Sequence, residues 1–287
     1  MKASAVIAFC PGHISGYFRR VPGSSPAVTG SIGSGIVISE GVTVTVRPSQ
    51  ETRIEIKRTY PSGRVSSSSG SLLISSALER LQVTASIVTE CRLPIGAGFG
   101  LSAAALLASL CATNRLLGLG MSSREIALLA HEEEVIHRTG LGDVSACQGG
   151  GLVVRTRPGI DGVNERRFDL TGPLYAVSFG PIHTPEVLGS EERMRQVSAA
   201  FPAETPKDIP DFFTLCRKFT ERSDLMTTEV KNTLERCDAA GVPASMTMLG
   251  NGVFACGRDV CRILETLGDV YEFHVAQDGV HIVREIA

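Results

Sequence analysis

Residues 94–104, PIGAGFGLSAA, place three alternating glycines directly before a run of helix-forming residues. Gly96, Gly98 and Gly100 leave the backbone without side chains, which suits unusual dihedral angles or the close approach of a ligand. The Ala- and Leu-rich run over 101–117 predicts a helix, whose free N–H groups and partial positive charge favour a bound anion. The segment therefore predicts a phosphate-binding loop, with a tight strand-to-helix turn without a ligand as the alternative.

The familiar phosphate-binding loops do not match this spacing. A Walker A loop ends in Gly-Lys-Ser or Gly-Lys-Thr, and the chain contains no Gly-Lys pair. The dinucleotide-binding fingerprint G-x-G-x-x-G is replaced here by G-x-G-x-G. The protein-kinase motifs, including D-F-G, are also missing. The loop therefore belongs to another class of phosphate site.

Segment 94–104 resembles the nucleotide loop of the GHMP kinase superfamily, named for its galactokinase, homoserine, mevalonate and phosphomevalonate kinase members. Phe99 and Leu101 replace the commoner Leu and Ser of that loop. Two further motifs of the superfamily have counterparts, CPGH at 10–13 and MLGNGVFACG at 248–257. The resemblance implies a two-lobed α+β kinase that uses ATP and Mg²⁺, with its site in the cleft between the lobes.

The resemblance also implies which residues hold ATP and the metal ion. Loop amides can bind the triphosphate, and the hydroxyl of Ser102 can bind Mg²⁺ in the first helical turn. A simple helix cap is the alternative role of Ser102. The residues expected at the ATP site are Pro94, Gly96, Ala97, Gly98, Phe99, Gly100, Leu101, Ser102 and Ala103.

Magnesium also needs a carboxylate, and Glu132, Glu133 and Glu134 lie together in a helix predicted over 124–138. Helical spacing places Glu133 on the apolar stripe of this helix and its two neighbours about 100° to either side, where solvent is expected. A carboxylate on an apolar stripe needs a cation or strong donors. We therefore expect Glu133 to bind the metal, with an ion pair between Glu133 and an arginine as the alternative. The stripe consists of Ile126, Leu129 and Ile136.

Asp143, in GLGD at 140–143, matches the segment whose aspartate faces the acceptor hydroxyl in related kinases. The resemblance implies that Asp143 accepts or orients the hydroxyl proton, and a turn-forming role is the alternative. His13 stands where the superfamily usually has lysine. We expect it to contact the acceptor, unless it is a plain polar loop residue. The residues expected at the substrate site are His13, Ser31, Gly33, Gly250 and Asn251.

Segments 9–18, 30–35, 140–143 and 248–254 most resemble archaeal pantoate kinases, which phosphorylate pantoate to 4-phosphopantoate on the route to coenzyme A. The expected acceptor is therefore this small hydroxy acid. Homoserine, shikimate or a mevalonate-like acid remain alternatives, as does a non-catalytic regulator that binds a nucleotide or metabolite. The acceptor carboxylate needs an arginine or backbone amides, and the sequence leaves open Arg19, Arg20, Arg155 and the amides of 31–35.

Strands and helices are interspersed along the chain, which favours an α+β fold. Turn signals at 11–12 and 40–41 are expected to reverse the chain, so that 36–57 forms an antiparallel meander. The polar segment 61–71 is expected to be a mobile loop. We place the domain boundary in the loop-rich stretch after 156, giving an ATP-binding domain over 1–160 and an α+β domain over 161–287, which the resemblance implies is ferredoxin-like. Helices are expected over 72–82, 101–117, 124–138, 186–200, 210–222 and 226–240.

The composition excludes several other classes of protein. A net charge of −2 over 287 residues gives no electrostatic case for nucleic acid or an anionic membrane surface. No apolar run is long enough to cross a membrane. None of the eight cysteines forms a C-x-x-C pair, so we expect them to be reduced. These features predict a cytoplasmic enzyme for a small molecule, and a homodimer remains open.

Overall fold

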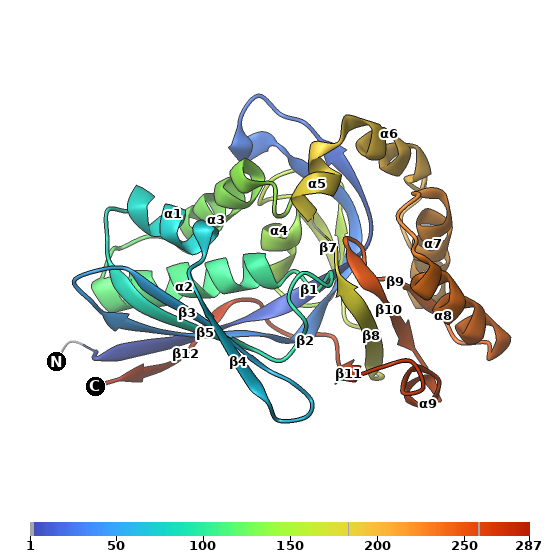
Figure 1. Ribbon diagram of the computed structural model, residues 1–287. Coiled ribbons are helices and arrows are strands. Elements are labelled where there is room, and N and C mark those ends of the chain that lie inside the picture. Colours follow the sequence, from blue (N-terminus) through green and yellow to red (C-terminus); the bar gives the residue numbers. More distant parts are fainter. Residues whose placement is uncertain (1–2, 183, 258) are drawn as a thin grey trace.

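The computed structural model describes residues 3–182, 184–257 and 259–287, and two sheets organise them (Figure 1). The larger sheet has the strand order β12-β1-β2-β5-β3-β4, and β6 pairs with β2 and with β7. Two long antiparallel strands, β1 (Ala5–Val21) and β2 (Gly30–Pro48), run through its centre. The other strands are β3 (Arg53–Thr59), β4 (Val65–Ser69), β5 (Ala85–Cys91), β6 (Leu152–Arg155), β7 (Val163–Arg167) and β12 (His281–Ile286).

The turn signals at 11–12 and 40–41 are bulges inside these two long strands, so the expected chain reversals there are wrong. The pairing of β1 with β2 shifts register between Pro11 and Gly12, opposite Gly41. A side chain on Gly41 would collide with the carbonyl oxygen of Cys10. Because a glycine that lets two backbones approach closely serves a bulge as well as a turn, the residue types alone did not separate the two.

The expected meander is also wrong, because β5 lies between β2 and β3. β5 pairs antiparallel with β2 and parallel with β3. Segment 61–71, expected to be a loop, contains β4, which pairs antiparallel with β3 at the edge of the sheet. An edge strand tolerates a run of serines, since it needs no apolar face on both sides.

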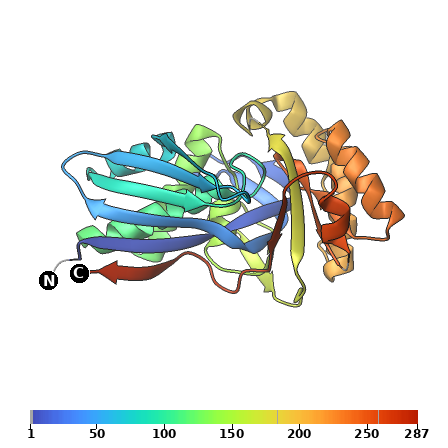
Figure 2. The same cartoon turned by 60° about the horizontal axis from the view of Figure 1, so that its bottom comes forward.

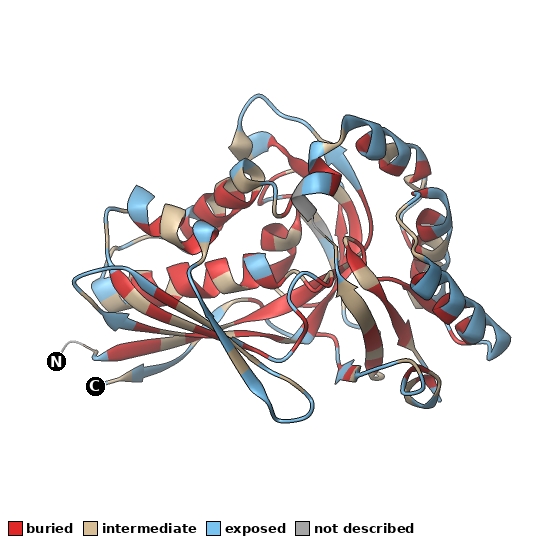
Figure 3. Ribbon diagram, in the orientation of Figure 1, coloured by how far each residue is buried: buried red, intermediate tan, exposed pale blue. Residues whose placement is uncertain are grey.

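Four helices cover one face of the larger sheet, and Figure 2 shows the opposite face without a helix. They are α1 (Leu72–Arg80), α2 (Leu101–Leu117), α3 (Ser123–His137) and α4 (Asp143–Cys147). The expected start of α3 is confirmed, because Ser122 and Glu125 form a reciprocal capping box. Figure 3 shows that buried residues gather where these helices meet the sheet and one another.

The smaller sheet is antiparallel, with the order β11-β8-β10-β9. In chain order this is 4-1-3-2, with helices in the β8–β9 and β10–β11 connections, so the expected ferredoxin-like lobe is confirmed. Its strands are β8 (Leu174–Pro181), β9 (Ala244–Met246), β10 (Gly250–Cys256) and β11 (Val270–Phe273). The helices of this part are α5 (Thr184–Gly189), α6 (Glu191–Ala200), α7 (Ile209–Arg222), α8 (Thr228–Ala239) and α9 (Val260–Leu264).

Two strands from beyond residue 160 join the larger sheet. β7 pairs with β6, and β12 pairs antiparallel with β1, so that both ends of the chain lie side by side (Figures 1 and 2). The division at residue 160 stays a prediction, and the chain crosses between the two sheets more than once. The site between the sheets is therefore built from segments far apart in the sequence.

All eight cysteines are free, and five of them are buried. Burial raises the pKa of buried thiols such as Cys10 and Cys216, which lowers their reactivity. Among the described residues, no helix combines the length and the apolar character needed to cross a membrane.

Candidate active site

A cavity of about 600 Å³ lies between the two sheets, beside the glycine loop. Part of its wall is apolar and comes from β2, β3, α1 and the segment before the loop. Another part carries polar groups from β2, the start of α2, the turn after α3 and the start of α4. The apolar wall includes Val42, Ile56, Leu73, Ile74 and Ile95, and the polar wall includes Ser31, Ser102, Thr139 and Asp143.

The glycine loop needs its three glycines for conformation and for packing. Gly96, Gly98 and Gly100 have φ angles of 76°, 82° and 62°, in the left-handed region that favours glycine. A Cβ on Gly98 would lie 2.9 Å from the carbonyl oxygen of Met248, and one on Gly100 would lie 3.1 Å from that of His13. The loop is therefore held between β1 and the turn before β10. Gly100 is the N-cap of α2, whose first residues line the cavity.

Six of the nine residues expected at the ATP site line the cavity: Gly96, Gly98, Phe99, Gly100, Leu101 and Ser102. The other three are buried and are not part of its wall: Pro94, Ala97 and Ala103. The glycine loop therefore lines the cavity, while these three residues pack in the core.

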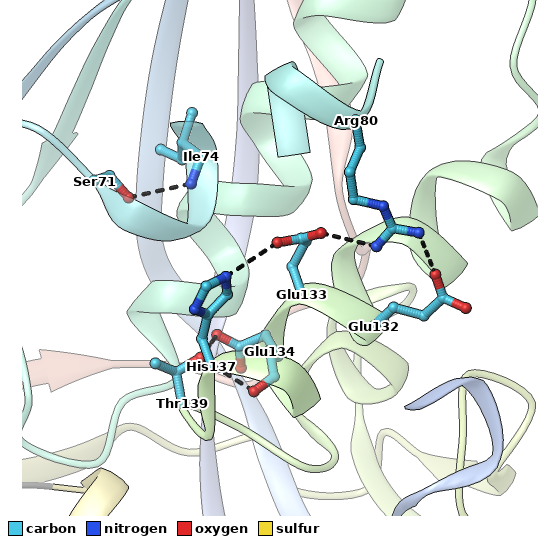
Figure 4. A network of polar contacts seen from close by, with 8 residues as sticks. All are labelled: Ser71, Ile74, Arg80, Glu132, Glu133, Glu134, His137 and Thr139. Carbon is cyan, nitrogen blue, oxygen red and sulfur yellow. Dashed lines mark hydrogen bonds and ion pairs between the residues drawn. The ribbon is translucent and has the colours of Figure 1, made fainter. Parts of the chain in front are cut away.

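Glu134 occupies the place that we expected for Glu133. The Ser102 hydroxyl donates to Glu134 Oε1 at 2.8 Å, whereas Glu133 accepts from Arg80 at 2.8 Å. The expectation that Glu133 faces Ser102 is wrong, and the alternative ion pair with an arginine is observed (Figure 4). The apolar stripe was misjudged at its end, because the side chain of Ile136 is exposed. Glu134, expected in solvent, is only 1% exposed.

Two carboxylates lie close together here, the buried one of Glu134 and the partly exposed one of Asp143. A side chain on Gly140 would collide with Glu134 Oε2 and would lie 3.2 Å from Asp143 Oδ2. Burial, reinforced by the charge of Asp143, raises the pKa of Glu134 to about 7, although hydrogen bonds from Ser102 and Thr139 oppose the rise. Glu134 Oε2 is buried and has no hydrogen-bond partner among the described residues. This donor set suits a hard divalent cation.

Protein ligands alone would not complete such a cation site. In the described ranges, no group of three or more His, Cys, Asp or Glu side chains is placed to hold a metal ion. Mg²⁺ characteristically binds one or two carboxylates and takes its remaining ligands from water and substrate phosphates. The residues present therefore fit a magnesium ion that arrives with a nucleotide.

His13 lies behind Asp143 and outside the cavity wall. It is fully buried, and its Nδ1 lies 2.7 Å from Asp143 Oδ1. Burial lowers the pKa of His13, so we assign a neutral ring that donates from Nδ1. Burial acts to raise the pKa of Asp143, but the bond with His13 and the charge of Arg155 leave it below its usual value. Asp143 is therefore an ionised acceptor at the start of α4.

Arg155 is a buried cation without an ion-pair partner among the described residues. It is 2% exposed; its Nη1 donates to the Gly142 carbonyl oxygen at 2.8 Å, and its Nε has no partner. A Cβ on Gly142 would lie 2.5 Å from the guanidinium and 2.7 Å from the Ser31 hydroxyl, so these two groups meet beside Asp143. The other candidate arginines, Arg19 and Arg20, are exposed.

Of the residues expected at the substrate site, Ser31 alone lines the cavity in the described part of the chain. Gly33 has a φ angle of 152° and packs against the carbonyl oxygen of Tyr17. Gly250 packs against the backbone of Ala97, and Asn251 accepts a hydrogen bond from Thr227 at 2.7 Å. With His13, these residues surround and support the site. Reasoning from the sequence missed Glu134 and Thr139, for which no signal separated them from solvated residues.

Comparisons with known proteins agree with this geometry. The family described as GHMP kinases N terminal domain matches residues 72–151, the stretch from α1 to the end of α4 that contains the glycine loop, Glu134 and Asp143. A solved homoserine kinase from Cytophaga hutchinsonii superimposes with a TM-score of 0.64 at 17% identity, over 98% of each chain, which shows a shared fold. Fold and site together are those of a GHMP-type small-molecule kinase.

Closer relatives narrow the class. The chain is 45% identical to a pantoate kinase of Methanospirillum hungatei over 99% of this chain and 98% of the relative. It is 31% identical to a pantoate kinase of Thermococcus kodakarensis, over 88% and 87% of the two chains. A solved "phosphotransferase related to CoA biosynthesis pathway" covers 98% of this chain and 99% of its own, with a TM-score of 0.77 and 25% identity. The chain belongs to the pantoate kinase family of GHMP kinases.

Proposed function

We propose that the protein transfers the γ-phosphoryl group of ATP to the hydroxyl group of pantoate, giving 4-phosphopantoate for coenzyme A synthesis. The observation that carries this proposal is the full-length similarity to pantoate kinases, at 45% identity. The site supports it, because the ionised carboxylate of Asp143 lines the cavity, and the buried guanidinium of Arg155, which is not itself part of the cavity wall, bonds to the neighbouring Gly142 carbonyl. A hydroxy acid brings the two groups that these side chains can bind.

ATP is proposed to bind with its triphosphate on the glycine loop and on the first N–H groups of α2. Ser102 and Glu134 would hold Mg²⁺, and the structure favours Glu134 over Glu133 because the Ser102 hydroxyl bonds to Glu134 directly. When bound, the ion offsets negative charge on the phosphate oxygens. The apolar wall that includes Ile56, Ile74 and Ile95 suits the nucleobase.

Asp143 is the proposed acceptor of the hydroxyl proton. Its carboxylate lines the cavity and is ionised, so it can orient the acceptor hydroxyl and take its proton as the phosphorus–oxygen bond forms. His13 does not reach the cavity, and we assign it a positioning role. Its Nδ1–H fixes one carboxylate oxygen of Asp143, which leaves the other oxygen for the substrate.

Arg155 and Ser31 are proposed to receive the carboxylate of the acid. A guanidinium binds a carboxylate with two parallel hydrogen bonds, and among the described residues Arg155 uses only one of its five N–H groups, toward the Gly142 carbonyl. A buried cation that lacks a partner is unfavourable until an anion binds. The acid would therefore be held by its carboxylate at Arg155 and by its hydroxyl at Asp143.

A panel of acceptor acids tests this function. The purified protein is mixed with ATP, Mg²⁺ and pantoate, homoserine, shikimate or mevalonate, and ADP release and the phosphorylated product are measured. We expect the highest kcat/KM with pantoate. A higher kcat/KM for another acid would identify that acid as the acceptor. If the protein binds the nucleotide but releases no ADP with any of the acids, the alternative of a non-catalytic regulator would be supported. The proposed activity places the protein in the cytoplasm, and a homodimer stays a prediction.

A further inference from the structure

Glu132, Glu133 and Glu134 are adjacent on α3, and the first two both bind Arg80. Glu134 bonds to Ser102 in the site. Glu133 accepts from Arg80 Nη1 at 2.8 Å, and its second oxygen lies 3.3 Å from His137 Nε2. Figure 4 shows this cluster, in which Arg80 lies over α3 and His137 lies on the other side of the Glu133 carboxylate. Arg80, Glu133 and His137 do not line the cavity, so the proposed reaction gives these three residues no role.

The cluster ties together two elements that face different parts of the nucleotide. Arg80 is the last residue of α1, whose first turn and N-cap, with Ser71, Leu73 and Ile74, line the cavity. Glu133 belongs to α3, which also carries Glu134. The ion pair therefore joins the apolar wall of the cavity to the helix that holds the metal-binding carboxylate.

The burial of Glu133 makes this contact specific. Its side chain is 1% exposed, whereas Arg80 is 42% exposed and Glu132 is 21% exposed. A buried carboxylate must be paired, but apolar residues of similar volume often stabilise a fold as well as a buried ion pair does. Apolar packing of Ile74, Ala77 and Leu78 already holds α1 down. The ion pair in addition fixes the orientation of α1, because it favours one rotation and one register of α1 on α3.

We propose that Arg80, Glu133 and His137 form a positioning cluster that sets the affinity of the site for ATP. This inference rests on the proposed function, which places the nucleobase against α1 and the triphosphate beside Glu134. A shift of α1 would change the distance between the two parts of the nucleotide site. The acceptor side would be unaffected, because Asp143 and Arg155 lie on α4 and β6, whereas α1 packs on α2 and α3.

The test compares Arg80→Met with Glu132→Gln. Arg80→Met keeps the apolar stem and removes both ion pairs; we expect the Kd and KM for ATP to rise about tenfold, which corresponds to about 1.4 kcal/mol. The turnover number and the KM for pantoate should stay within about twofold, as expected for a loss of nucleotide binding only. Glu132→Gln removes only the charge of the outer ion pair of Arg80, keeps an oxygen that can accept its hydrogen bond, and should leave the affinity for ATP unchanged.

A double variant separates positioning from stability. Arg80→Met leaves the buried Glu133 carboxylate without its arginine, with only His137 at 3.3 Å among the described residues, and will lower the melting temperature. The double variant Arg80→Met/Glu133→Leu removes that charge. We expect the double variant to regain stability while its affinity for ATP, measured by calorimetry, stays weak. If the double variant regains both its stability and its affinity for ATP, the inference is overturned. An unchanged affinity for ATP in Arg80→Met would overturn it as well. Failure of the wild-type protein to bind ATP would instead overturn the proposed function itself.

Discussion

Replacement of Glu134 by glutamine should abolish activity and yet stabilise the metal-free protein at alkaline pH. Glu134 is 1% exposed, and its Oε2 faces Asp143 Oδ2 across Gly140. Its ionised form is therefore unfavourable in the folded state, which is why its pKa is raised from 4.5 to about 7. Glutamine has nearly the same shape and carries no charge.

The sign and the size of this change in stability follow from the difference in proton binding by Glu134 between the folded and the unfolded chain. Between pH 4.5 and about 7 the unfolded chain loses the Glu134 proton while the folded chain keeps it, so the free energy of unfolding falls as the pH rises. The distance from 4.5 to about 7, at about 1.4 kcal/mol for each pH unit, gives about 3 kcal/mol. This loss is complete above about pH 8. The glutamine of Glu134→Gln does not ionise, so this decrease in the free energy of unfolding does not occur in the variant.

Urea denaturation of both proteins with a chelator present, at about pH 4.5 and about pH 8, measures this effect. We expect the variant to gain about 3 kcal/mol relative to wild type between the two pH values. Glu79→Gln, at an exposed position of α1, controls for the loss of one negative charge. The same stability difference between variant and wild type at both pH values would refute the reasoning, as would full kinase activity of Glu134→Gln.

Substitutions at three further residues separate the other proposed roles. Asp143→Asn should lower the turnover number by about 10²–10⁴-fold and leave the Kd for ATP unchanged, and near-normal turnover would reduce Asp143 to scaffold. His13→Leu should lower turnover about 10–100-fold, because Asp143 loses its fixed hydrogen bond, whereas His13→Asn, whose amide can donate in place of Nδ1, should recover much of it. Arg155→Leu should raise the KM for pantoate about 10–100-fold with the KM for ATP unchanged, and an unchanged KM for pantoate would move the carboxylate site elsewhere.

Local sequence signals predicted the backbone of the site well. The helix predicted over 101–117 has the observed bounds, and the capping box at Ser122 starts α3 as expected. The glycines at 96, 98 and 100 all adopt the left-handed conformation that their presence indicated. Such features depend on dihedral preferences and on bonds within a few residues, which neighbouring residues decide by themselves. The order of the three motifs was sufficient to indicate the class of kinase.

The direction of side chains was decided by tertiary packing. α3 packs against both α1 and α2, so it has more than one buried face and both Glu133 and Glu134 are buried. An apolar stripe defines one face of a helix, and it could not show which of two adjacent carboxylates meets Ser102 and which meets Arg80.

His13 and Arg155 depended on the long strands in the same way. Bulges let β1 continue past Pro11 and bring His13 behind Asp143, a residue 130 positions away in the chain. β6 places Arg155 opposite Gly33 in the sheet and next to Gly142, which is why we propose it rather than Arg19 or Arg20 for the acceptor carboxylate. The sequence by itself determined the glycine loop, the helix that follows it and the class of chemistry. Tertiary structure alone decided which charged groups meet, because partners distant in the chain become neighbours only when the sheet is assembled.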